Sequence, residues 1–239
     1  VDHKEVFRTA EKYYGPLKSR PLPLRKPQDE PAQKGVRRLT VKAPAELPVI
    51  MMGYRAPIIR DVEKDVDPYA LEMLGAIFSG HGAARFSKHL VREQRLAISA
   101  GAEYDATARG PGMFYLIGTP SEGKTVGEME AGLRAEIARV QAEGVTAEEL
   151  NRAKTQLVAA EIYKLDSMFA QAMEIGQLDS VGLPYRSGER IIEKLKSVTA
   201  DQVQDVAKRY FGDDSLTVGV LDPQPLADAP RRPAANVRH

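Results

Sequence analysis

The chain has 239 residues, of which 43% are hydrophobic and 28% charged, and its 34 Lys and Arg against 33 Asp and Glu leave a formal net charge of +1. This balance, typical of a soluble globular protein, gives no electrostatic reason to expect nucleic acid or an anionic membrane as a partner. The absence of cysteine excludes disulfides, thiolate metal ligands and cysteine nucleophiles, and it leaves the redox compartment open.

Residues 2–15 form an amphipathic helical pattern that ends in two aromatic residues and a glycine. A similar ending recurs near the other end of the chain, where Tyr210-Phe211-Gly212 matches Tyr13-Tyr14-Gly15 at a constant offset. A repeated ending of this kind indicates a duplicated domain. We therefore interpret residues 1–16 as the end of a preceding homologous domain, with chance similarity as the alternative.

The next segment, residues 17–36, carries four prolines among charged residues and predicts an extended linker. Two strands follow, at Arg38–Ala43 and Val49–Ala56, where apolar residues alternate with polar ones between proline breaks. Asp67 as an N-cap and Pro68 in the first turn predict a helix that stops at Ser79.

A second helix is predicted to carry Phe86 and Leu90. The segments Leu96–Tyr104 and Met113–Thr119 alternate like the two strands of a hairpin, joined through a Gly- and Pro-containing turn. From Thr125 onward the period changes to about 3.6 residues, which predicts a helix that Gly144 ends.

Capping-box patterns at Thr146 and Thr199 start two more helices, the first predicted to run to about Met173. A shorter helix begins near Ser187, and Ser215–Leu221 alternates as a final strand. Residues 223–239 read as a disordered tail. The order of elements excludes a doubly wound parallel sheet and predicts an α+β domain, a mostly antiparallel sheet with helices packed on one face.

The sequence contains no clear metal-binding or catalytic motif. The histidines are His3, His81, His89 and His239, and no two of them have the i, i+4 spacing of a helical zinc pair. His89 and Glu93 have that spacing, but two ligands do not make a site. No serine lies in a nucleophile-elbow context. We therefore predict no catalytic residue and no metal ligand in this chain.

The stretch Ser79–Ser99, SGHGAARFSKHLVREQRLAIS, resembles a segment of the insulinase/pitrilysin family of zinc peptidases, the inverted zincins, which also includes the mitochondrial processing peptidase. The similarity extends over residues 37–222, through Thr146–Leu150 and the ending at Gly212. The resemblance implies that residues 37–222 are an inactive peptidase-like domain, and that residues 1–16 close the domain before it.

Family members hold zinc in the half that comes first, through an inverted His, Glu and His signature that this chain lacks. The resemblance thus implies a non-catalytic half that closes a chamber and helps to bind an extended peptide substrate. Zinc and proteolysis would reside in a partner domain, upstream or in a separate subunit, and a dimer is compatible with this. The alternative is a structural or assembly protein in which neither half is active. The family favours the periplasm over the cytoplasm.

Active family members contribute an Arg and a Tyr, seven residues apart, from this half to the substrate. Aligned without gaps, those positions are Val91 and Ile98, neither of which carries a polar group. Arg92 lies one residue away and could serve if the helix end shifts its register. Arg92 is therefore the one substrate-binding residue that the resemblance suggests.

Overall fold

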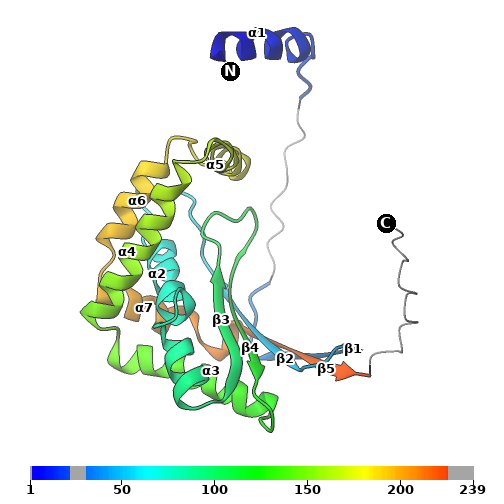
Figure 1. The fold of residues 1–239 in the computed structure, drawn as a ribbon, viewed down its shortest axis with the longest axis vertical. Coiled ribbons are helices and arrows are strands. Elements are labelled where there is room, and N and C mark those ends of the chain that lie inside the picture. Colours follow the sequence, from blue (N-terminus) through cyan, green and yellow to red (C-terminus); the bar gives the residue numbers. More distant parts are fainter. Residues whose placement is uncertain (1, 22–30, 226–239) are drawn as a thin grey trace, which may run out of the picture. The chain divides into compact units, whose positions relative to one another are not determined.

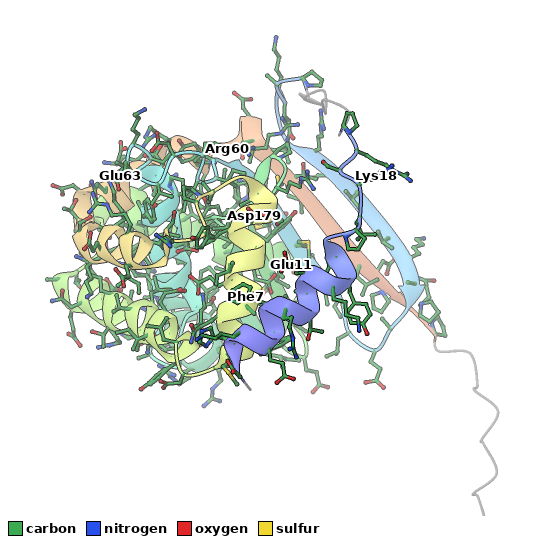
Figure 2. All side chains as sticks on the ribbon, turned by 90° about the horizontal axis from the view of Figure 1, so that it is seen from above. Phe7, Glu11, Lys18, Arg60, Glu63 and Asp179 are labelled. Atoms are coloured by element: carbon green, nitrogen blue, oxygen red, sulfur yellow. The ribbon has the colours of Figure 1, made fainter. Side chains whose placement is uncertain are left out.

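The computed structural model describes residues 2–21 and 31–225 and divides the chain into two units, Val1–Ala32 and Gln33–His239. The first unit contains helix α1, His3–Tyr14, which Asp2 caps by accepting a hydrogen bond from the backbone of Lys4. The helix has no buried residue, and Figure 2 shows Phe7 and Glu11 on successive turns of it. Residues 22–30 of the predicted linker and the predicted tail from residue 226 onward lie outside the described residues.

The second unit is built on one five-stranded sheet (Figure 1). The strands are β1 (Arg37–Pro44), β2 (Val49–Ala56), β3 (Ala97–Tyr104), β4 (Gly112–Pro120) and β5 (Leu216–Gln224). Their spatial order is β1-β5-β2-β4-β3. Only the β1–β5 pair is parallel, so the predicted mostly antiparallel sheet is confirmed, and the final strand lies inside the sheet between β1 and β2.

The two faces of the sheet differ in burial because side chains alternate along each strand. In β4, Phe114 and Leu116 are fully buried, whereas their neighbours Met113, Tyr115 and Ile117 are partly exposed. Figure 1 shows the helices gathered on one side of the strands, which is the buried side. The predicted packing of helices on one face is therefore confirmed.

Eight helical segments complete the described part of this unit. They are α2 (Asp67–Ser79), η1 (Phe86–Glu93), α3 (Val126–Glu143), α4 (Ala147–Lys164), α5 (Met168–Val181), α6 (Gly188–Ser197), α7 (Ala200–Tyr210) and the short η2 (Asp213–Ser215). Both predicted capping boxes form, with Glu149 and Gln202 bonding back to Thr146 and Thr199. Helix α2 is the most deeply buried of them, with nine buried residues.

Two predictions about helix ends are wrong. The helix that starts after Thr146 does not reach Met173: α4 ends at Lys164, and the Ser167 side chain starts a new helix by accepting from the Ala170 backbone. Asp67 is the first residue of α2 and not its N-cap. Its carboxylate accepts hydrogen bonds from Arg209 of α7 at 2.6 and 2.7 Å and so joins α2 to α7.

Two boundaries also shift. Strand β5 continues to Gln224, because its parallel pairing with β1 extends to Pro44 and organises the first two residues of the predicted tail. Gln33, inside the predicted linker, is buried and donates from its side chain to the Leu216 carbonyl oxygen at 2.6 Å. The end of the linker therefore packs against the sheet domain.

An ion pair joins the segment before η1 to the turn between α3 and α4. Arg85, which is buried, donates to both carboxylate oxygens of Glu149 at 2.7 and 2.9 Å and to the Gly144 carbonyl oxygen. Desolvation acts to raise the pKa of Glu149, but the Arg85 and Thr146 hydrogen bonds outweigh it and lower the pKa to about 2. A depressed pKa means that this carboxylate stabilises the fold when it is ionised.

We expect Glu149→Gln to lower the free energy of unfolding by about 2 kcal/mol at pH 7, because the variant keeps a competent capping residue but loses the charge. The folded pKa lies below the ordinary value of 4.5, so this stability is present above pH 4.5 and is lost as the pH falls toward 2. Urea unfolding from pH 7 to pH 3 should show the wild type and the variant converging. Glu148→Gln, which alters an exposed pair with Arg152, should change stability by less than about 0.5 kcal/mol.

Candidate functional site

The segment Phe86–Glu93, which includes Val91 and Arg92, folds as a π-helix. In η1, backbone hydrogen bonds skip one residue more than in an α-helix, as in the bond from Gln94 N–H to the His89 carbonyl oxygen at 2.9 Å. Each turn therefore holds about one residue more. The chain leaves η1 through Arg95, which has a φ of 48° and is the only non-glycine residue with positive φ among those described.

Val91 and Arg92, near the end of η1, differ in exposure. Val91 packs against the hydrophobic core, whereas Arg92 is exposed. The Arg92 guanidinium donates to the Gly82 carbonyl oxygen. The role of Arg92 in substrate binding stays a prediction.

Ile98 is the second of the two family positions, and the structure gives it no polar substitute. It lies in β3 at the irregularity between Ala97 and Ser99, where its side chain is 53% exposed. Arg92 and Ile98 thus both reach the surface, one polar and one apolar.

The outer edge of β3 is partly occupied by a side chain. The Ser79 hydroxyl, at the end of α2, accepts from the Ala102 N–H at 2.8 Å and donates to the Ala102 carbonyl oxygen at 3.1 Å. One hydroxyl thus satisfies both groups that an added strand would use at this residue. A peptide that pairs with β3 at Ala102 has to displace Ser79, which the sequence pattern did not indicate.

His89 lies beside a buried carboxylate and not beside its helical neighbour Glu93. Its Nδ1 atom is 2.9 Å from Glu136 Oε2, and Glu136 is fully buried in α3. Arg139 completes the cluster, with Nη1 3.0 Å from Glu136 Oε1 and 2.8 Å from His89 Nδ1; its contact with Glu136 is an ion pair without hydrogen-bond alignment. A buried carboxylate is retained where cations compensate its charge, which is the case here.

The described residues, which exclude His239, contain three of the four histidines. Among the described residues no three His, Asp or Glu side chains converge in a way that could hold a metal ion. His81 Nδ1 accepts a hydrogen bond from the Ala83 N–H in the turn after α2, and His3 lies in the other unit. The donor groups of residues 2–21 and 31–225 therefore do not fit zinc. In the same part of the chain, no helix is long and apolar enough to span a bilayer.

Glu72 is a candidate functional residue that the sequence reading missed. It is the only charged residue between Tyr69 and Phe78 of α2, whose other side chains are almost all buried. Desolvation, followed by the nearby negative charge of Glu161, raises the pKa of Glu72 to about 7. A single carboxylate within a buried apolar helix was the signal that could have identified it.

Comparison with known proteins adds three findings. A family described as the peptidase M16 inactive domain matches residues 1–157. An uncharacterized zinc protease of Rickettsia bellii is 26% identical over 227 residues, which cover 95% of this chain and 52% of that protein, and a Rickettsia felis zinc protease is 24% identical over 226 residues with the same coverage. The chain therefore spans about half the length of the curated relatives it matches.

Solved structures share the fold. A protease from Helicobacter pylori superposes with a TM-score of 0.81 at 22% identity, covering 93% of this chain and 53% of that one. A peptidase M16 inactive domain from Pseudomonas fluorescens gives 0.74 at 16% identity, over 95% and 53% of the two chains. The periplasmic protease PqqL from Escherichia coli gives 0.75 at 14% identity, over 95% of this chain and 27% of its own.

Ser79→Ala should open the edge of β3. Loss of the hydroxyl leaves the Ala102 N–H and carbonyl without their partner, which we expect to cost about 1–2 kcal/mol of stability. Hydrogen exchange followed by NMR should show the Ala102 amide exchanging about tenfold faster or more. Ser99→Ala, an exposed change on the same strand, is the control; equal exchange at Ala102 in wild type and Ser79→Ala would contradict the capping role.

Proposed function

Because the chain belongs to the family of peptidase M16 inactive domains, we propose that it is the non-catalytic half of a zinc metallopeptidase. In this role it closes the substrate chamber and helps to bind an extended peptide. Hydrolysis then depends on a zinc-binding half, located upstream in the same polypeptide or in a partner subunit. The observation that carries the proposal is the family match together with coverage of only half of the related zinc proteases.

The open face of the sheet supports a role as a chamber wall. Three large apolar side chains on β1 and β2, Leu39, Val41 and Met51, are between 43% and 50% exposed on the face opposite the helices of this unit. An exposed apolar face on a folded domain is typical of a surface that contacts another molecule. A chamber that holds an extended peptide needs an apolar wall of this kind.

Arg92 is proposed to bind the substrate backbone. The exposed guanidinium of Arg92 in the π-helix η1 supports this assignment, and its bond to the Gly82 carbonyl oxygen is of the kind that a substrate backbone would accept. Ile98 cannot donate a hydrogen bond, so this half would contribute one polar contact where active relatives use two. We therefore expect it to help in binding and not in the chemistry itself.

Zinc belongs to the other half in this proposal, because the donor set of the described residues does not fit the metal. The compartment proposed is the periplasm, on the same family resemblance. The alternative, a structural pseudo-peptidase with no active half, is favoured by the loss of a polar group at Ile98. The two alternatives differ in whether the partner half carries the zinc signature.

The isolated chain should contain less than about 0.1 zinc per protein and should not cleave peptides. The reason is that its described carboxylates and imidazoles do not converge on a common point. Elemental analysis after dialysis, with a fluorogenic peptide assay, measures both. A one-to-one zinc content with chelator-sensitive cleavage would overturn the proposal.

Arg92→Ala should reduce kcat/KM of the assembled peptidase about 10- to 100-fold, the effect of losing one charge-assisted hydrogen bond to the substrate. Lys88→Ala, which removes an exposed charge from the same helix, should leave it within about twofold. Arg92→Lys should recover part of the loss. An unchanged kcat/KM in Arg92→Ala would show that the side chain does not touch the substrate.

A further inference from the structure

A cavity of about 370 Å³ lies beneath α5. Its walls come from α2, α4, α5 and α6 and from the segments that follow β2 and β3, so six parts of the chain meet around it. The face of α5 that lines it carries Ala170, Met173, Glu174, Gln177 and Leu178, a spacing of three and four residues that keeps them on one side of the helix. The cavity is thus part of the packed fold.

The charged residues of this cavity are predominantly acidic. Glu72, Asp105, Glu161 and Glu174 line it together with a single cation, Lys164. Lys164 is already engaged, because its Nζ atom donates to Glu161 at 2.6 Å. An incoming cation would therefore meet an excess of negative charge in this cavity.

Glu72 differs from Asp105 and Glu161, whose carboxylates accept hydrogen bonds from other side chains. Its side chain is partly buried and lines the cavity, and no hydrogen bond or ion pair joins it to any described residue. A carboxyl group partly removed from water without a partner carries a free-energy cost that a bound cation would reduce. Glu72 also lines a second cavity of about 300 Å³, which extends along the β3 edge past Ser79 and Ala102.

The surface beside the cavity is apolar and flexible in its side chains. On α5, the residues Met168, Phe169, Met173 and Ile175 are between 48% and 88% exposed. Met173 belongs both to this surface and to the cavity lining, and Phe169 lies one turn before it. Methionine-containing apolar surfaces adapt to different partner side chains. The acidic cavity and the apolar face of α5 therefore adjoin at Met173.

We propose that this surface binds an apolar peptide segment that carries an arginine or lysine, whose side chain enters the cavity beneath α5 and pairs with Glu72. The acidic cavity would bind the basic side chain, and the exposed apolar face of α5 would bind the apolar residues on either side of it. The cavity is large enough for one long basic side chain. This binding concerns the isolated chain and does not rest on the proposed function as half of a peptidase.

The test uses the full 239-residue chain and a fluorescent 12-residue peptide of leucine and alanine with one central arginine. A matched peptide carries citrulline, which has nearly the same shape without the charge. Fluorescence anisotropy at pH 8 should show the arginine peptide binding at least tenfold more tightly than the citrulline peptide. Equal affinity for the two peptides, or no binding of the arginine peptide, would overturn the proposal.

Variants assign the effect to Glu72. Glu72→Gln should weaken the arginine peptide about tenfold, to the level of the citrulline peptide, and Glu72→Asp should give an intermediate value because it keeps the charge on a shorter side chain. Glu148→Gln removes an exposed acid from α4 and should change neither affinity. Thermal unfolding verifies that each variant is folded, and unchanged affinity in folded Glu72→Gln would refute the assignment.

The pH dependence gives a second readout. Between pH 6 and pH 8 the arginine peptide should bind more tightly as Glu72 ionises, whereas the citrulline peptide should show little change. The groups that face Glu72 are Glu161 and Lys164 from α4, Asp105 from the segment after β3, and Glu174 from α5. If Glu72→Gln keeps the same pH dependence, one of these groups and not Glu72 is responsible, which would also refute the assignment.

Discussion

The burial of α2 is the constraint on which the rest of this domain depends. This helix packs against β3, α4, α6 and α7, and nine of its thirteen residues are buried. Complete burial of each large apolar side chain contributes roughly 1.5–3 kcal/mol, so α2 supplies a large share of the driving force for folding. Every polar group on this helix consequently needs a partner or a route to solvent.

Two polar residues of α2 meet this requirement through partners, and a third, Glu72, has no partner among the described residues. Asp67 pairs with Arg209, which holds the pKa of the carboxyl below its ordinary value and ties α2 to α7. Ser79 bonds the backbone of Ala102 and thereby closes part of the β3 edge. Glu72 has neither kind of partner and faces a cavity. Asp67 and Ser79, which have hydrogen-bond partners, hold the fold together. Glu72, which has none in the described part of the chain, is where we propose a binding site.

The segment after α2 shows how local geometry can alter a site without changing its composition. In η1, Val91 packs partly buried against the core and Arg92 is exposed, which a gapless alignment on a motif cannot reveal. The turn ends in a strained residue, Arg95, and leads directly into the edge strand that carries Ile98. The π-helix and this strain lie in the same short stretch that carries the family resemblance. Strain and π-helical turns concentrate at functional sites in proteins.

The amino-acid sequence by itself determined the fold class, all five strands and the placement of most helices, because those follow from local hydrophobic period and from capping residues such as Thr146 and Thr199. It also indicated the family, through the Ser79–Ser99 stretch. Only the tertiary structure decided the break between α4 and α5, the register of η1, the capping of Ala102 by Ser79 and the isolation of Glu72. Each of these depends on what a side chain meets across the fold, and a sequence pattern records only neighbours along the chain.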